Sequence, residues 1–215
     1  MGDFEEYTIL TNSPWIFGSS RLFHILIGEN LPEDSLFYQA ALLQQKSHNI
    51  HSYYEDLTDI PKRKIFCPRE IWSKYVNKPE DFLCEENSVK AVQFVNEMIT
   101  DALRHVEDSL EFSSKIKDPS VFRFHALPRV LSMTSAASCY NNIQVFRKDM
   151  RENPDVRAKL LEQTRSMEDV YNIFYDISCT MQSKVDKDDP HAREIKSRLE
   201  SIKKKCKESG TLNHI

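Results

Sequence analysis

Residues 88–113 read SVKAVQFVNEMITDALRHVEDSLEFS, and this stretch decides the fold class. Six apolar side chains recur in it at steps of three or four residues: Val92, Val95, Ile99, Leu103, Val106 and Leu110. Side chains at this spacing form one apolar stripe along a helix. The stretch therefore predicts a single long helix. The hydroxyl of Ser88 can cap its first turn by accepting a hydrogen bond from a backbone N–H group.

A second long helix is predicted over residues 120–146. Its apolar residues lie on most sides, which is typical of a helix at the centre of a protein. Pro128 falls inside this helix and predicts a bend, because a proline in a helix interior removes one backbone hydrogen bond. Asp118-Pro119 separates the two long helices, because proline is favoured at the first position of a helix.

The rest of the chain shows shorter helical patterns and breaks. Helices are predicted over residues 36–57, 156–181 and 191–207, with a weak point at Arg165-Ser166 in the second of them. A break is predicted at Asn12-Ser13-Pro14, and a loop is predicted over residues 58–70. The chain has only 4 glycines, whereas an all-β protein needs many glycine-rich turns. The sequence therefore predicts one all-α domain.

Composition and charge exclude several classes of function. The chain has 215 residues, 40% of them hydrophobic, which suits one globular domain. Its net charge of −4 leaves no broad basic surface for nucleic acid. No apolar run approaches the ~20 residues that span a bilayer, so we expect no transmembrane segment. The five cysteines show no C-x-x-C spacing, which predicts reduced thiols and a cytoplasmic location.

The stretch 45–56 concentrates polar side chains at helical spacing. His48, Ser52 and the carboxylates of Glu55 and Asp56 would share one helix face, since residues three and four apart are neighbours. Two carboxylates beside a cavity can hold Mg²⁺, which prefers oxygen ligands and bridges substrate phosphates. The alternative is a polar helix end that simply faces solvent.

The same residues and their neighbours suggest two other kinds of site. His48, His51 and Glu55 have a spacing that could place two imidazoles and a carboxylate around zinc, and this alternative stays open. A thiol nucleophile made of Cys139 and His125 is excluded. These two residues are fourteen positions apart on one predicted helix, or about 21 Å at ~1.5 Å per residue.

Five segments resemble a known family in their order and spacing. They read SRLF at 20–23, REIWSKYV at 69–76, SVFRFHALPRV at 120–130, ASCYNN at 137–142 and VF at 145–146. Together they resemble the C-terminal half of eukaryotic squalene synthases, where the later region reads V-F-x-F-C-A-I-P-x-V, then A-C-Y-N-N, then V-F. The resemblance covers residues 7–181. Residues 182–215 would add a polar C-terminal helix and tail.

This resemblance implies the all-α isoprenoid (terpenoid) synthase fold, in a truncated form with a single domain. Members of the family join two farnesyl diphosphates through presqualene diphosphate and reduce the product with NADPH to squalene. Two aspartate-rich motifs on facing helices hold Mg²⁺ ions, because ionisation of an allylic diphosphate develops negative charge that cations must meet. The first motif would lie before Tyr7, so this chain would supply only the second.

The second aspartate-rich motif carries over with one substitution. Its pattern D-x-x-E-D falls on residues 52–56, which makes Glu55 and Asp56 the expected metal ligands. Ser52 stands where the family has the first aspartate, and a hydroxyl brings no charge to Mg²⁺. We therefore expect Mg²⁺ binding to be weak or lost. Counting back from SRLF also places Leu10 where the family has a catalytic tyrosine.

The resemblance implies roles for further residues. The implied substrate-binding residues are Arg21, Gln45, His48 and Ser52. Phe122 and Phe124 match aromatic positions of the catalytic pocket, where rings can stabilise a carbocation, and His125 beside them replaces a cysteine. Arg147 and Arg151 are what remains of the basic stretch that the family uses near NADPH.

The expected function is that of a squalene synthase-like protein of isoprenoid and sterol biosynthesis. It would bind farnesyl diphosphate or a related isoprenoid diphosphate but, as a pseudoenzyme, would have no standalone catalysis. One alternative is an active farnesyltransferase whose cavity is completed by a second chain or fragment. Another is a non-catalytic helical interaction module. The resemblance also leaves open an association with the face of the endoplasmic reticulum.

Overall fold

The computed structural model describes residues 2–30, 32–59, 67–151 and 153–212. The α-helices are α1 (Gly2–Ile27), α2 (Asp34–His51), α3 (Tyr53–Thr58), α4 (Arg69–Trp72), α5 (Ser88–Leu103), α6 (Val106–Ser114), α7 (Pro119–Cys139), α8 (Pro154–Gln163), α9 (Met167–Ser183) and α10 (Ala192–Glu208). Short 3-10 helices are η1 (Pro79–Leu83), η2 (Glu85–Asn87) and η3 (Ile143–Phe146). The described residues contain no strand, so the all-α prediction is confirmed.

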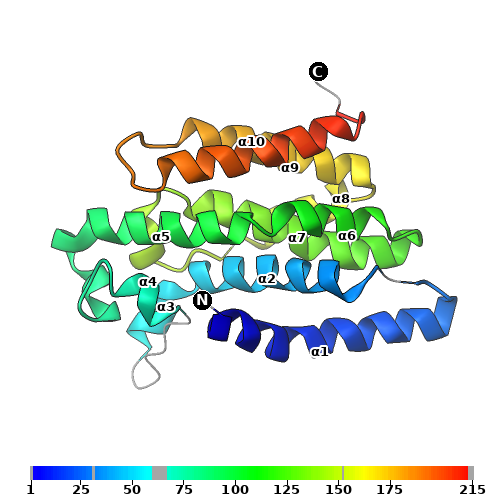
Figure 1. Cartoon of the computed structure of the whole chain (residues 1–215), viewed down its shortest axis with the longest axis horizontal. Coiled ribbons are helices and arrows are strands. Elements are labelled where there is room, and N and C mark those ends of the chain that lie inside the picture. Colours follow the sequence, from blue (N-terminus) through cyan, green and yellow to red (C-terminus); the bar gives the residue numbers. More distant parts are fainter. Residues whose placement is uncertain (1, 31, 60–66, 152, 213–215) are drawn as a thin grey trace.

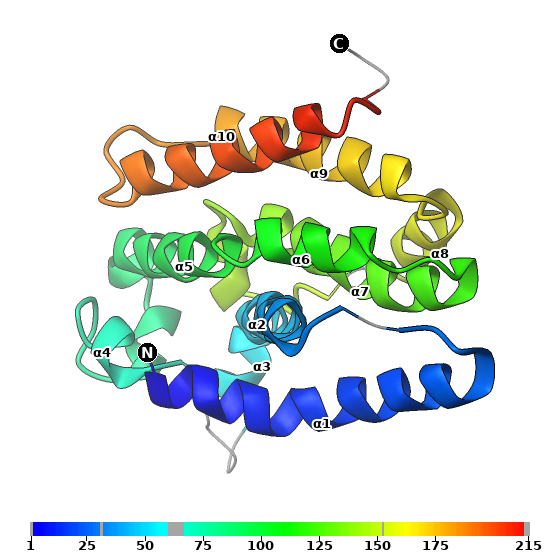
Figure 2. The same cartoon turned by 45° about the vertical axis from the view of Figure 1, so that its right-hand side comes forward.

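The helices stack in layers, and α2 lies inside the stack (Figure 1). One side of α2 contacts α1, and its other sides contact α5, α6 and α7. The antiparallel pair α9 and α10 covers the far side of α5 and α7, and Figure 2 shows the same order of layers after rotation. The outermost layers are therefore α1 on one side and the α9–α10 pair on the other.

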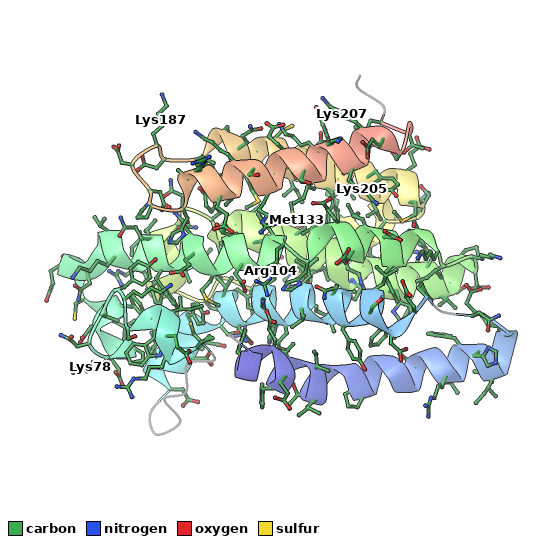
Figure 3. All side chains as sticks on the ribbon, viewed as in Figure 1. Lys78, Arg104, Met133, Lys187, Lys205 and Lys207 are labelled. Atoms are coloured by element: carbon green, nitrogen blue, oxygen red, sulfur yellow. The ribbon has the colours of Figure 1, made fainter. Side chains whose placement is uncertain are left out.

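One cluster of buried side chains joins these layers. Met133 of α7 is fully buried near the middle of the molecule (Figure 3). At one end of the helices, aromatic rings stack: the centroids of Phe82 and Phe94 are 4.5 Å apart, and those of Phe82 and Phe146 are 5.0 Å apart. This stack holds the short helices η1 and η3 against α5. Aromatic pairs at such distances add to the stabilisation from buried area.

The predicted long helix over residues 88–113 is divided in two. The break falls at Arg104 and His105, between α5 and α6. The His105 side chain contacts Lys46 Nζ and Gln39 Oε1 of α2, and these non-local hydrogen bonds accompany the break. The expected cap is also wrong. Ser88 is the first residue of α5, and its hydroxyl donates to the carbonyl oxygen of Glu85.

The second long helix ends earlier than predicted. It stops at Cys139, and Asn141 then adopts φ 52°, a left-handed conformation that asparagine tolerates better than most residues. Asn142 begins a separate turn, because its side chain accepts from the backbone N–H of Gln144. The break predicted at Asn12-Ser13-Pro14 is wrong as well, since α1 continues through Pro14. A proline removes one hydrogen bond, and the remaining turns of this long helix persist.

The later helices agree better with the predictions. The weak point at Arg165-Ser166 is confirmed: Ser166 caps α9, and its hydroxyl accepts from the backbone N–H of Asp169, whose carboxylate accepts from the N–H of Ser166 in return. The helix predicted over 36–57 is interrupted at Ser52, between α2 and α3. Most of the loop predicted over 58–70 lies outside the described residues, and α4 begins at Arg69.

The predicted C-terminal helix is α10. It packs on α9 through a buried stripe that recurs every three or four residues: Ile195, Leu199, Ile202 and Cys206. Lys207 lies on the outer side of α10 (Figure 3), whereas Lys205 contacts Glu111 of α6 at 3.7 Å. In the part of the chain that the structure describes, no helix combines the length and the hydropathy needed to cross a bilayer.

Candidate functional site

A groove of about 390 Å³ lies between α2 and α7 and reaches α8. The α2 side is lined by Gln44, Gln45, Ser47, His48 and His51. The α7 side is lined by Leu127, Pro128, Leu131, Ser132 and Ser135, and α8 contributes Arg157. The volume falls in the range of small-molecule sites. The lining combines polar and basic side chains from α2 and α8 with apolar side chains from α7.

The polar wall of the groove is positioned by α2. Gln45 and His48 are three residues apart, so they share a face of the helix, and both line the groove. The rings of His48 and His51 lie 4.7 Å apart at 77°. His51 Nδ1 lies 2.9 Å from Ser135 Oγ, which ties α2 to α7 inside the groove. Two of the residues implied as substrate-binding, Gln45 and His48, are therefore brought together here.

The carboxylates of the aspartate-rich motif lie outside this groove. Because α2 ends at His51, the face predicted to run from His48 to Asp56 is divided between α2 and α3. The hydroxyl of Ser52 donates to the carbonyl oxygen of His48 at 3.3 Å. Glu55 Oε1 is 2.5 Å from a guanidinium nitrogen of Arg151. Burial, and then the neighbouring charge of Glu55, raise the pKa of Asp56 to about 6.

These donors do not fit a preformed Mg²⁺ site. Ser52 brings no charge, and Glu55 already faces a guanidinium that competes with a metal ion for its oxygens. The zinc alternative finds no better support. Among the described residues, the group of three metal-ligand side chains that comes within 4.8 Å consists of Glu5, Asp101 and His105, and it contains neither His48 nor His51.

That group already holds a cation, which is the ammonium of Lys46. Lys46 Nζ lies 2.8 Å from Glu5 Oε1, 2.5 Å from Asp101 Oδ2 and 2.9 Å from His105 Nε2. The Lys46 side chain is fully buried, and its burial is compensated because both carboxylates are within contact. Arg104 joins the same network beside α2, as Figure 3 shows. The network connects α1, α2 and α5 through charged side chains.

The two phenylalanines of the implied catalytic pocket point apart. Phe122 is 5% exposed and belongs to the core, whereas Phe124 is 36% exposed and meets the ring of Phe23 at 5.2 Å. Neither residue lines the groove between α2 and α7. Arg21, the remaining implied substrate-binding residue, lies exposed on α1.

The two arginines of the implied NADPH region both have protein partners. Arg147 donates to the carbonyl oxygens of Phe82 and Phe146 and to the hydroxyl of Ser88. These bonds fasten η1 and η3 to the start of α5. Arg151 contacts Asp149 in addition to Glu55.

A buried cation on α7 was not foreseen from the sequence. Arg129 is 2% exposed, and its guanidinium lies 4.9 Å from the centre of the Phe112 ring and donates to the carbonyl oxygen of His125. Its Nε and Nη2 atoms have no hydrogen-bond partner among the described residues. Burial lowers the pKa of Arg129 to about 9. Burial, and then the charge of Arg129, lower the pKa of His125 to about 3.

The sequence held a signal for some of the missed residues and none for others. Lys46 lies three residues after Leu43 and four before Ile50, which is the register of the buried stripe of α2. That register predicts a buried lysine, which needs a carboxylate partner. Arg157 comes from α8, and no local pattern shows that α8 reaches the groove.

Comparisons with known proteins agree with this fold. No protein-family model matches the chain. Squalene synthase 8 of Panax ginseng is 47% identical over 211 residues, covering 98% of this chain and 54% of that protein. A squalene synthase of Solanum lycopersicum is 46% identical over 211 residues, covering 98% of this chain and 51% of that protein. The chain thus spans about half the length of these relatives.

The fold also matches solved structures. The structure of TcSQS with the ligand E5700 superposes with a TM-score of 0.90 at 24% identity, covering 96% of this chain and 61% of that one. The complex of TcSQS with BPH1237 superposes equally well. The described helices therefore adopt the all-α isoprenoid synthase fold that the sequence predicted. Over nearly its whole length, this chain is a homologue of squalene synthases and spans about half of their length.

Proposed function

We propose that this chain binds an isoprenoid diphosphate in the groove between α2, α7 and α8, and that it forms no squalene on its own. The similarity to squalene synthases supports the ligand class. The groove suits such a ligand, because polar side chains, His48 and Arg157 among them, line one side of it while Leu127 and Leu131 of α7 can contact an apolar chain.

The proposed loss of catalysis rests on one observation, which is that the aspartate-rich motif is altered. Ser52 stands at the position of its first aspartate, and Glu55 is paired with Arg151. Ionisation of an allylic diphosphate requires preorganised positive charge at the leaving group. Removal of one such stabilising group costs ~10²–10³ in rate. Here two of the expected metal ligands are affected, Ser52 by substitution and Glu55 by its pairing with Arg151. Mg²⁺ binding is accordingly proposed to be weak or lost.

Product analysis tests this proposal. Purified chain is incubated with farnesyl diphosphate, Mg²⁺ and NADPH, and presqualene diphosphate and squalene are measured. We expect no product above a no-protein control, and we expect Ser52→Asp alone to restore none, because Arg151 still occupies Glu55. A known active squalene synthase serves as the positive control. Squalene above the no-protein control would refute the proposed loss of catalysis.

A second candidate function is an active farnesyltransferase completed by a second chain. The exposed apolar side chains of α1 favour it, since they offer a surface for association: Leu10, Leu22, Ile25, Leu26 and Ile27. Adding the N-terminal half of a squalene synthase in trans tests this candidate, and product formed only in the mixture would support it. From the resemblance to squalene synthases, we also propose a cytoplasmic location next to the endoplasmic reticulum.

A further inference from the structure

A second groove, of about 340 Å³, lies where α5 begins, between that helix, the turn after α7 and the loop that joins α9 to α10 (Figure 1). Part of its lining is apolar: Val89 is 71% exposed, and Val92 and Ile143 also line the groove. The α9–α10 loop contributes three aspartates: Asp186, Asp188 and Asp189. None of the described lining residues is a lysine, an arginine or a histidine. This acidic groove therefore combines exposed apolar surface with negative charge.

A buried asparagine holds both sides of the acidic groove in place. Asn96 of α5 is 1% exposed, and its Nδ2 donates to Asp189 Oδ2 at 2.7 Å. Its Oδ1 accepts from the backbone N–H of Asn141, in the turn after α7, at 2.9 Å. Asn141 Nδ2 donates in turn to the carbonyl oxygen of Lys184, just after α9. The groove is therefore preformed, and a ligand would lose little free energy in ordering it.

Two of the three aspartates offer their charge to a partner. Asp186 and Asp188 are exposed, and neither forms a salt bridge within the described part of the chain. Asp186 Oδ1 accepts from the backbone N–H of Asp188 at 3.0 Å, a hydrogen bond that does not neutralise the carboxylate. Lys187 lies between them in the sequence but points away from α5 (Figure 3). Asp189 is buried, and both of its carboxylate oxygens accept hydrogen bonds within the protein.

The arrangement of these carboxylates suits a peptide better than a metal ion. Among the described residues, the aspartates of the groove do not form a group of three ligand atoms within 4.8 Å of one another. Separated carboxylates are complementary to several ammonium or guanidinium groups carried on one segment of chain. The apolar surface beside them gains free energy when apolar side chains of the same segment cover it.

We propose that the acidic groove is a docking site for a basic and apolar segment of another protein. Lysine or arginine side chains of this segment face Asp186 and Asp188, and one or two of its apolar side chains cover Val89 and Val92. A groove of this size accommodates a short segment rather than a folded domain, so the complex should be weak and transient. The site lies apart from the groove between α2, α7 and α8, so the inference does not depend on isoprenoid binding.

Fluorescence anisotropy with short synthetic peptides tests the inference. In the probe set, two apolar residues are flanked on each side by two lysines or arginines. One comparison set has serines in place of the apolar residues, and the other has glutamates in place of the basic residues. We expect the whole chain to bind members of the probe set at least tenfold more tightly than matched members of either comparison set. No binding of the probe set would overturn the inference, and so would equal binding of the serine set, which would show attraction by charge alone.

Matched charge variants locate the binding. Asp186→Asn with Asp188→Asn removes two negative charges but keeps the side-chain oxygen that accepts the backbone N–H of residue 188. This double variant should weaken binding of the tightest probe peptide about tenfold. Glu168→Gln with Asp176→Asn makes the same change in net charge on exposed residues of α9 that do not line the groove, so it should leave the affinity unchanged. Equal weakening by the two double variants would overturn the inference.

A variant without a change in charge tests the apolar contact. Val89→Ser removes exposed apolar surface, so it should weaken the probe set about threefold and leave the serine set unchanged. An unaltered affinity for the probe set would contradict the proposed contact and overturn the inference.

Reversal of the charge gives an independent test. Asp188→Lys with Asp186→Asn should make glutamate-flanked apolar peptides bind more tightly than lysine-flanked ones, because the repulsion now acts on the basic peptides. A variant that still prefers lysine-flanked peptides would show that they bind elsewhere, and the inference would fail.

Discussion

At the scale of single residues, Arg129 is the clearest source of instability. Its guanidinium is buried, it has no carboxylate within the described contacts, and its Nε and Nη2 atoms lack partners there. Replacement of a buried ion by an apolar residue of similar volume is often stabilising by about 1–4 kcal/mol. Arg129→Met should therefore raise the free energy of unfolding by an amount in that range, measured by urea denaturation at neutral pH.

Arg193→Met on α10 is the control for this prediction. Arg193 is exposed, and its replacement should change the free energy of unfolding by no more than about 0.5 kcal/mol. A clear loss of stability in Arg129→Met would contradict the prediction. It would mean that the contact with the Phe112 ring and the bond to the carbonyl of His125 outweigh the cost of burying the charge.

His125 predicts a specific dependence of stability on pH. Its pKa is lowered to about 3 by burial and by Arg129, whereas an unfolded histidine titrates near 6.5. Between these values the unfolded chain binds a proton that the folded chain does not, so stability is present above pH ~6.5 and is lost as pH falls toward ~3. Lowering the pH from ~6.5 to ~5 should cost about 2 kcal/mol through His125 alone.

The variant His125→Cys, which installs the residue of the family pattern, isolates this contribution. Urea denaturation at several pH values should show a loss of stability on acidification that is smaller by about 2 kcal/mol than in the unaltered chain. The remaining loss includes His105, whose pKa is lowered to about 3 by burial and by Lys46. Identical slopes for the variant and the unaltered chain would show that His125 does not titrate in this range.

Helical spacing, as a local property, predicted a shared face from His48 to Asp56, and the structure divides that face between α2 and α3. Gln45 and His48, which the resemblance implies for substrate binding, both line the groove. The spacing could not show that Glu55 meets Arg151, which lies 96 residues further along the chain. Nor could it show Arg157 at the groove. Such pairings depend on how helices distant in sequence pack together.

At the scale of elements, α1 is attached by carboxylates near its two ends. Glu5 contacts Lys46 and Arg104, and Glu29, just after the helix, accepts hydrogen bonds from the backbone N–H groups of Lys117 and Asp118 at 2.9 and 3.2 Å. Both N–H groups lie just before α7, which begins at Pro119. Glu29 therefore couples the end of α1 to the beginning of α7.

Removing the Glu29 charge should loosen α1 selectively. In Glu29→Gln the single amide oxygen cannot accept both bonds as the carboxylate does, and a loss of about 1 kcal/mol should speed amide hydrogen exchange in α1 roughly fivefold. Exchange in α9 and α10 should not change. Glu6→Gln, an exposed change on α1, is the control. Faster exchange spread evenly over all helices would contradict a local role for Glu29.

The elements themselves were predicted more reliably than their ends. The apolar stripe of residues 88–113 identified helical structure correctly, since periodicity reports which face is buried. The break at Arg104 and His105 was not predictable, because it coincides with hydrogen bonds from His105 to α2. Conversely, the weak point at Arg165-Ser166 was detectable, because the cap that Ser166 forms there acts over only three residues.

At the scale of the whole molecule, the apolar surface of α1 predicts association. Leu22, Ile25, Leu26 and Ile27 near its end are between 52% and 77% exposed. Neighbouring exposed apolar side chains of this kind mark interaction surfaces or aggregation-prone surfaces. Sedimentation velocity should therefore show a weight-average mass that rises with protein concentration. The double variant Ile25→Glu with Leu26→Glu should lower the apparent association constant at least tenfold.

Val89→Glu is the control for the association experiment. Val89 is 71% exposed but lies on α5, away from α1, so its replacement should leave the concentration dependence unchanged. A chain that stays monomeric over the full concentration range would show that the exposed side chains of α1 do not drive association. Equal effects of the α1 variant and Val89→Glu would point to net charge instead of a defined surface.

The attachments of α1 also set an order of events during synthesis. Glu5 meets partners 41 and 99 residues later in the chain, and Glu29 meets partners 88 and 89 residues later. At ~5–20 residues per second, a ribosome needs roughly 5–20 s to make the segment that follows Glu29 up to the start of α7. Throughout that interval Phe23 of α1 lacks Phe124 and His125 of α7, the rings that it contacts in the finished fold. The nascent chain should therefore depend on chaperones until the start of α7 leaves the exit tunnel.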